Sequence, residues 1–423
     1  MDAGLARRRV ALPLLRRLTG CDLLPKGLET LRSLDSGRPA LGGYDGVIGH
    51  VPSVWQRLIQ QVAPTGLRSY GICPFQYFAR QVLRLRSIEE PEEIGEVGPV
   101  EVGTLAHAIL RDVHRAWHAE GIRGDGWRAV DIAASLARAA APHFHDYART
   151  HPVGYPFLWE VTQARLLDLL SRVLQEDLQD LQDGGWRPIL FESPVQADVP
   201  VALPTGSETL HCEGQIDRVD WAAARKTYRI LDYKYKTSRT AKTLEKNLTL
   251  AAVRGREWQP PFYLLMAEQM AQEASPADWP AGSVTSEGVW FQYLAPKWRE
   301  DEDGAVVTPV AFPGDAWTGS LGARLRATLA LVMEHIRSGR FFIAPGSDCE
   351  QCDYRTMCRL HHQPSRWRAR ADHTQVETYR RLRHAEVDKP GGAPATDRTS
   401  TGDAASETPP TRKRRIRDRD SLK

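Results

Sequence analysis

The chain has 423 residues, 42% of them hydrophobic, and its 56 basic and 53 acidic side chains give a formal net charge of only +3. This length suits one large domain with appendages or two ordinary domains, and a nucleic-acid surface would have to come from local clustering of charge. No apolar run reaches the roughly 18 residues of a membrane helix, and the apolar stretch after Arg7–Arg9 is too short for a secretory signal, so a cytoplasmic protein is expected.

Four segments follow one another along the chain. Residues 1–65 are rich in Arg and Leu with Gly and Pro breaks, and predict short helices of an N-terminal docking segment. Residues 66–365 alternate helical and strand-like patterns and predict the main α/β domain. Residues 366–388 predict a basic helical extension. Residues 389–423 predict a disordered basic tail, because a stretch so rich in Gly, Pro, Ser, Thr and charge cannot bury enough apolar surface.

A helix is predicted from Gly103, with His107 on its side. Its apolar stripe recurs every four residues at Leu105, Ile109, Val113 and Trp117 and should face the core. His107 lies about 200° around the helix from Leu105 and leaves that stripe. It is either a surface residue without a role or a site residue, depending on what lies near it.

Farther along, Phe191–Glu192 ends a strand-like run. Glu192 could join a metal site or orient a water molecule. An ordinary charged residue at a strand end fits its local context equally well.

A predicted β-hairpin carries the strongest chemical pattern in the chain. The polar stretch Ala222–Lys226 is typical of a turn, and pairing about its centre places Asp217 opposite Asp232. Facing like charges destabilise a ladder unless a divalent cation lies between them. Lys234 is two residues from Asp232 and shares its face. The hairpin therefore predicts a metal-dependent phosphodiesterase site.

A second helix is predicted to begin at Trp258–Gln259, with prolines in its first turn, where a missing N–H costs nothing. Gln259 and Tyr263 are four residues apart and share a face of this helix. Near a phosphodiester site, an amide and a phenol could hold a nucleic-acid backbone or base.

Three cysteines, Cys349, Cys352 and Cys358, fall within ten residues and indicate a metal site. A fourth ligand must come from elsewhere. His361 or His362 would complete a local zinc site, whereas Cys73 would join two segments that are distant in sequence. Cys21 and Cys212 are expected to be buried small hydrophobic residues.

Taken in order, these elements resemble the RecB-like branch of the PD-(D/E)XK nuclease superfamily, and most closely the iron–sulfur nuclease domain of AddB-type recombination subunits and CRISPR adaptation nucleases. The order of its elements, rather than any single motif, carries the resemblance. It implies an α/β restriction-endonuclease-like core, a mixed central sheet flanked by helices, closed by an iron–sulfur cluster clasp. The elements are Cys73-Pro-Phe, Gly103-x3-His107, Gly214-x-Ile-Asp217, Asp232-Tyr-Lys234, Gln259-x3-Tyr263 and Cys349-x2-Cys352-x5-Cys358.

The resemblance also implies roles for these residues. His107, Asp217, Asp232 and the carbonyl of Tyr233 would hold Mg²⁺ or Mn²⁺, and Lys234 would be the catalytic lysine. Gln259 and Tyr263 match the motif added by the RecB-like branch. The four ligands of a 4Fe–4S cluster would be Cys73, Cys349, Cys352 and Cys358.

The implied activity is DNA phosphodiester hydrolysis, as an exonuclease on single-stranded or unwound DNA, in recombination, repair or defence. The alternative is a catalytically silent, cluster-containing DNA-binding module of a helicase–nuclease complex. The chain shows no nucleotide-binding loop of the GxxxxGK[ST] type, so unwinding would require a helicase partner.

Overall fold

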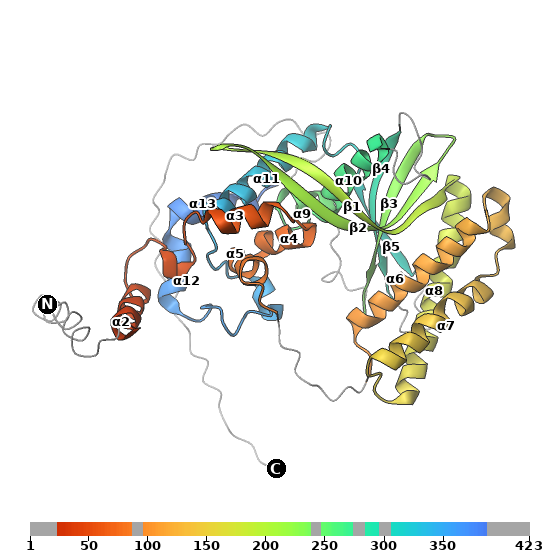
Figure 1. Ribbon diagram of the computed structural model, residues 1–423, viewed down its shortest axis with the longest axis horizontal. Coiled ribbons are helices and arrows are strands. Elements are labelled where there is room, and N and C mark those ends of the chain that lie inside the picture. Colours follow the sequence, from red (N-terminus) through yellow and green to blue (C-terminus); the bar gives the residue numbers. More distant parts are fainter. Residues whose placement is uncertain (1–22, 87–95, 238–246, 274–283, 296–305, 387–423) are drawn as a thin grey trace, which may run out of the picture. The chain divides into compact units, whose positions relative to one another are not determined.

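A mixed sheet of five strands in the order β1-β2-β3-β4-β5 is the central element of the part of the chain that the computed structural model describes, residues 23–86, 96–237, 247–273, 284–295 and 306–386 (Figure 1). The strands β3 and β4 are parallel, and the other neighbours are antiparallel. The strands are β1 (Arg187–Leu203), β2 (Gly206–Ala222), β3 (Thr227–Tyr235), β4 (Thr285–Leu294) and β5 (Val307–Pro313). The predicted tail, residues 389–423, and Cys21 lie outside the described residues.

The hairpin of β2 and β3 forms as predicted, with its turn between Ala222 and Thr227. Residues 227–233 of β3 are all buried, because the strand lies at the centre of the sheet and is covered on both faces. The prediction that a strand ends at Phe191–Glu192 was wrong. The strand β1 continues through Glu192 to Leu203, since its second half pairs with β2 as a long hairpin arm.

Three helices pack beside the sheet and share a core with it (Figure 1). They are α6 (Pro99–Ala119), α7 (Ile132–Thr150) and α8 (Pro156–Gly184), with the short 3-10 helix η3 (Gly124–Ala129) between α6 and α7. The helix α6 begins at Pro99, four residues before the predicted Gly103, because proline suits a first helical turn. Its predicted apolar stripe is buried, which orients His107 away from this core.

The crossover from β3 to β4 contains α9 (Leu248–Val253) and α10 (Gln259–Glu273), and α11 (Ser320–Arg337) follows β5. Tyr233 belongs to the core shared with α6, α7 and α8. Its neighbours Asp232 and Lys234 instead contact Gln259 at the start of α10. Because side chains alternate along a strand, α6 and α10 approach β3 from opposite faces.

Segments from both ends of the described chain pack together. The N-terminal elements are α2 (Leu23–Leu34), η1 (Gly43–Asp45), α3 (Pro52–Ile59), α4 (Pro64–Ile72), α5 (Pro74–Tyr77) and the π-helical turn η2 (Phe78–Val82). The C-terminal ones are η4 (Ser347–Gln351), α12 (Gln363–Ala371) and α13 (His373–Arg383). Asp45 forms a 2.7 Å ion pair with the buried Arg368, and Asp372 accepts a 2.7 Å hydrogen bond from the Leu41 amide while capping α13.

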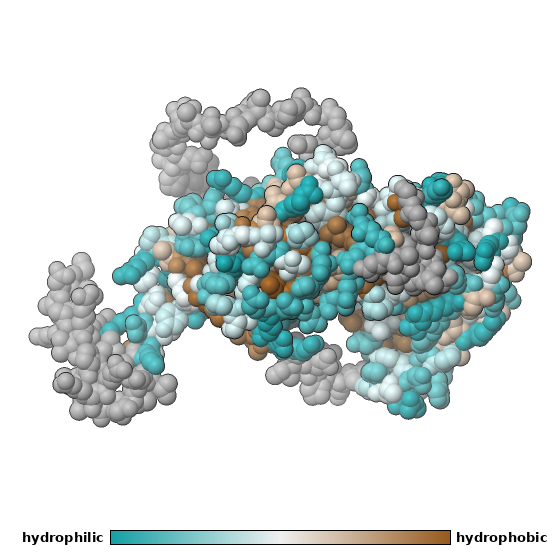
Figure 2. Space-filling view, turned by 45° about the horizontal axis from the view of Figure 1, so that its top comes forward, coloured by the Kyte–Doolittle hydropathy of each residue, from teal (hydrophilic) through white to brown (hydrophobic). Residues whose placement is uncertain are grey.

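The surface seen in Figure 2 is largely hydrophilic, with hydrophobic residues in small patches. No helix within the described ranges is both long and apolar enough to cross a membrane.

Candidate active site

Asp217 and Asp232 meet where the ladder between β2 and β3 ends. Its last pair joins Arg218 to Leu231, so the next position places Asp217 opposite Asp232, as the sequence predicted. At this position Asp217 Oδ2 accepts a 2.7 Å hydrogen bond from the backbone N–H of Tyr233. A carboxylate therefore occupies the point where β2 and β3 stop pairing, and both acids lie at the same end of the hairpin.

Asp232 is connected to the three other residues predicted around it. Its side chain is only 2% exposed, and its Oδ2 lies 2.5 Å from Lys234 Nζ. Lys234 Nζ also donates a 2.8 Å hydrogen bond to Gln259 Oε1. The amide nitrogen of Gln259 donates to Tyr263 Oη at 2.9 Å and to Asp232 Oδ1 at 3.4 Å. The start of α10 thus fixes the lysine against the buried carboxylate.

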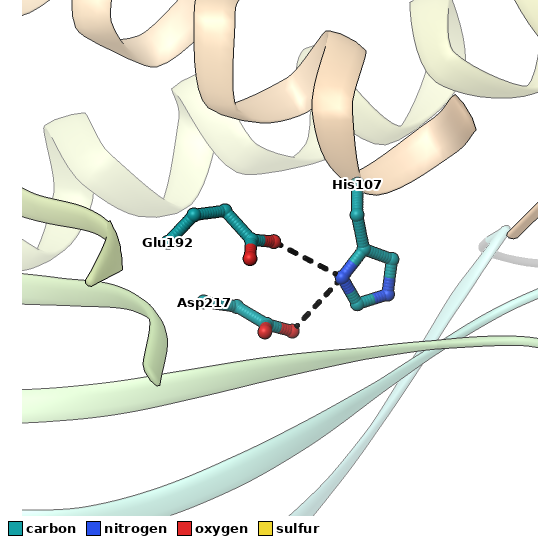
Figure 3. Close-up of side chains that lie close together, drawn as sticks. All are labelled: His107, Glu192 and Asp217. Atoms are coloured by element: carbon teal, nitrogen blue, oxygen red, sulfur yellow. Dashed lines mark hydrogen bonds and ion pairs between the residues drawn. The ribbon is translucent and has the colours of Figure 1, made fainter. Parts of the chain in front are cut away.

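His107, Glu192 and Asp217 form the second part of the site (Figure 3). Nδ1 of His107 lies 3.2 Å from Glu192 Oε1 and 3.3 Å from Asp217 Oδ2. One ligand atom from each residue falls within 4.8 Å of the other two, which is close enough for a single cation to contact all three. Asp232 lies outside this group, where it contacts Lys234.

The charges in the site depend strongly on burial and proximity. Burial opposes a charged His107, but hydrogen bonds and charge from Asp217 and Glu192 outweigh this and raise its pKa to about 10. Burial raises the pKa of Asp232 to about 7, the Lys234 ammonium acts in the opposite direction, and the Asp217 charge adds to the rise. The pocket therefore favours a positive charge between its carboxylates.

Glu192 holds its position through an unusual backbone conformation. Its φ is +45°, in the left-handed region that residues other than glycine rarely adopt. Its carboxylate accepts a hydrogen bond from Gln215 on β2 in addition to its contact with His107. The sequence pattern suggested Glu192 only weakly, because a strained residue in the middle of a strand leaves no local signal.

A cleft of about 590 Å³ opens in front of these groups. Its walls include His107, Glu192, Tyr233 and Lys234, together with the cations Arg111 and Lys236. A polyanionic substrate could therefore approach the carboxylates along a surface that carries compensating positive charge.

Sequence reasoning missed a buried ion network next to the hairpin. Arg218, 1% exposed, contacts Asp177 of α8 at 2.7 Å and Asp220 at 2.6 Å. It also donates a 2.9 Å hydrogen bond to Tyr233 Oη. Arg229 binds the same Asp220 at 2.9 Å. The network holds the Tyr233 side chain on the face of β3 opposite to Asp232 and Lys234, and only the fold brings α8 into contact with it.

Four cysteines from two segments that are distant in sequence line one small cavity. Cys73 lies between α4 and α5, and Cys349, Cys352 and Cys358 belong to the segment around η4. Backbone amides donate to two of the sulfurs at 3.4 Å, from Ala344 to Cys73 and from Gly346 to Cys349. Burial raises the pKa of Cys358 to about 11, with further contributions from the other three cysteines.

The family model of the PD-(D/E)XK nuclease superfamily matches residues 61–359, and the chain belongs to this superfamily. The match covers the sheet, the candidate active site and the four cysteines of the cavity. No curated protein matches the chain. A crystal structure of SSO0001 is similar at 12% sequence identity, covering 67% of this chain and 93% of that one, with a TM-score of 0.22.

Proposed function

We propose that this protein is a divalent-metal-dependent deoxyribonuclease. The observation that carries the proposal is the convergence of His107, Glu192 and Asp217 within 4.8 Å, beside the Asp232–Lys234 pair. Two acids and a nearby lysine at the end of a hairpin are the groups that a superfamily of metal-dependent nucleases requires, and the chain belongs to that superfamily.

The donor set fits Mg²⁺ or Mn²⁺. Both ions take oxygen ligands, and Mn²⁺ also accepts imidazole. The proposed ligands are His107, Asp217, Asp232 and the carbonyl of Tyr233, to which the geometry adds Glu192. Asp232 Oδ2 is buried 2.5 Å from Lys234 Nζ, so a cation bound by Asp232 would share this carboxylate with the lysine. When bound, such a cation polarises the phosphate and lowers the pKa of water.

Lys234 is the proposed catalytic lysine. Gln259 Oε1 and Asp232 Oδ2 hold the Lys234 ammonium at fixed distances. The Gln259 amide is in turn fixed by the hydrogen bond that it donates to Tyr263. An ammonium held in this way can position the attacking water and offset negative charge that develops on the phosphate. Because the dipoles are in place before substrate arrives, little reorganisation is needed during the reaction.

A 4Fe–4S cluster held by Cys73, Cys349, Cys352 and Cys358 is the proposed second cofactor, and the lining of one cavity by all four cysteines supports it. Tetrahedral zinc, with Zn–S bonds of about 2.3 Å, would require sulfurs about 3.8 Å apart. No three of these four sulfurs, all within the described residues, lie within 4.8 Å of one another. The four side chains therefore do not form a closed zinc site as they stand, and metal analysis of the purified protein decides between zinc and a cluster. When bound, the cluster would cross-link α4 and α5 to the segment around η4.

Finer aspects of the function follow from the resemblance to RecB-like nucleases. We propose exonuclease activity on single-stranded or unwound DNA in recombination, repair or defence, with a helicase or recombination protein as partner. The cleft between α6 and β3 and its flanking cations support a polyanionic substrate.

Cleavage of end-labelled single- and double-stranded DNA in Mg²⁺ tests the proposal. Asp217→Asn and Asp232→Asn should each lower the rate by at least about 10²-fold. Asp198→Asn is the matched control, because Asp198 is exposed on β1 and away from the hairpin end. Undiminished cleavage in both active-site variants contradicts the catalytic assignment, and wild-type protein that binds DNA without cutting it supports the silent module instead.

A further inference from the structure

Four arginines line a pocket of about 680 Å³ that is separate from the catalytic cleft. Arg57 comes from α3, and Arg80, Arg84 and Arg86 come from the π-helical turn η2 and the residues after it. All four are exposed. A pocket with this many guanidinium groups is suited to a ligand that carries several negative charges.

Within the described part of the chain, little negative charge lies against the four arginines of this pocket. Among the described residues, no carboxylate forms an ion pair with any of the four arginines, and the only acidic residue in the lining is Asp353. Arg57 donates a 2.9 Å hydrogen bond to the Val82 carbonyl, which orients it beside η2. Four guanidinium groups around one pocket repel one another, and a bound polyanion would relieve this repulsion.

The backbone of the pocket is strained. Leu85 N–H donates to Ala79 O at 2.9 Å across the widened turn, and Arg84 has a φ of +56°. A π-helical turn and a non-glycine residue at positive φ are each unfavourable for the backbone, and both concentrate at functional sites. Together they place Arg80, Arg84 and Arg86 around one hollow.

The pocket connects to both parts of the proposed machinery. Gln61 in the wall of the pocket donates a 2.7 Å hydrogen bond to Glu213. Glu213 is four residues before Asp217, which corresponds to about 14 Å along β2 between the two residues. On the other side of the pocket lies Tyr354, two residues after Cys352. Its hydroxyl donates a 2.9 Å hydrogen bond to the Leu85 carbonyl. One wall therefore leads toward the catalytic acids, and another depends on the cysteine segment.

We propose that this arginine pocket binds consecutive phosphates of a single-stranded nucleic acid whose cleaved bond lies at the Asp217–Asp232 site. The inference rests on the proposed nuclease function and adds to it a substrate-holding site. Arg guanidinium groups bind phosphate oxygens in pairs and stack on unpaired bases, and only a single strand presents both. A cluster held by the cysteines would then also shape this wall of the pocket.

Binding of a fluorescein-labelled oligothymidylate, measured by anisotropy without divalent metal, tests the site independently of cleavage. The full chain is used so that the negative charge of the four glutamates within residues 89–93, just after Arg86, is present in the measurement. For single strands the logarithm of affinity falls with the logarithm of salt by about 0.7 per phosphate contact. Arg80→Gln with Arg84→Gln should lower this slope by about 1.4, measured between about 50 and 200 mM salt, and weaken binding about tenfold.

Two controls sharpen the result. Arg138→Gln with Arg149→Gln removes the same charge from the exposed side of α7 and should leave the slope unchanged. Arg84→Lys keeps the charge but loses paired hydrogen bonds, so it should keep the slope and lose only part of the affinity. A slope in the pocket variant equal to that of wild type overturns the proposal. If Asp217→Asn loses cleavage but the Arg80→Gln, Arg84→Gln variant keeps the wild-type salt slope, the nuclease proposal stands and only the proposed binding pocket is rejected.

Discussion

Lys234 Nζ lies 2.5 Å from Asp232 Oδ2, and the two residues project from the same strand into the start of α10. Charge from Asp232 and Asp217 outweighs the effect of burial and raises the pKa of Lys234, so the ammonium stays charged. The lysine thus has two roles available to it, as the counter-ion of a buried carboxylate and as a cation facing the cleft.

Lys234→Met should lower the cleavage rate by about 10²- to 10³-fold, because it removes a fixed positive charge from the reacting phosphate. The proposed metal ligands are untouched, so Mn²⁺ binding measured by calorimetry should persist. Lys26→Met, at an exposed position on α2, is the control. Loss of Mn²⁺ binding together with activity would assign Lys234 a structural role only.

Glu192 variants separate ligation from backbone strain. Glu192→Gln should weaken Mn²⁺ binding at least tenfold, because the amide removes one negative charge beside His107. Glu287→Gln, an exposed change on β4, should leave it unchanged. Unchanged Mn²⁺ affinity in Glu192→Gln would remove Glu192 from the ligand set.

The φ of +45° at residue 192 predicts a second difference. The free energy of unfolding of Glu192→Gly should be about 1 kcal/mol larger than that of Glu192→Ala, because glycine adopts this conformation without strain. Urea unfolding of the two variants measures the difference. Equal stabilities would show that the strained conformation is not retained in solution.

Cys352→Ser should abolish bound iron and the brown colour of anaerobically purified protein. Its sulfur lines the cavity with the three other cysteines, and losing one of four ligands releases the cluster. Cys212→Ser, at a buried position in β2 outside the cavity, should keep both. Stoichiometric zinc in colourless wild-type protein would contradict the cluster assignment.

His335 predicts how stability depends on pH. Burial lowers its pKa to about 4, with a smaller effect of Arg340, and its ring bonds Thr378 Oγ1 at 2.8 Å. The unfolded chain, with a histidine pKa near 6.5, binds more protons between these values, so stability is complete above about pH 6.5 and falls as the pH drops toward 4. The loss is at most about 3 kcal/mol.

Urea unfolding at several pH values between these limits measures the effect. His335→Gln can keep a hydrogen bond to Thr378 and should flatten the pH dependence in this window. A curve for the variant parallel to that of wild type would show that other groups cause the acid destabilisation.

The sequence by itself determined the local elements of this protein. The turn after Ala222 and the separation of Asp217 and Asp232 from it predicted the hairpin register, because pairing in an antiparallel ladder is simple arithmetic along the chain. Period-four apolar spacing predicted the buried stripe of α6 in the same way. The hydrogen bond between Gln259 and Tyr263 follows equally from a helix in which the two residues are four positions apart.

Only the tertiary structure decided which of these elements meet. It brought Glu192 to His107 through a left-handed residue inside β1, which no strand pattern predicts, and it left Asp232 outside the group of His107, Glu192 and Asp217. It also placed Asp177 of α8 against Arg218. These contacts depend on how helices pack on a twisted sheet, and that packing energy is spread over the whole core rather than encoded in any short segment.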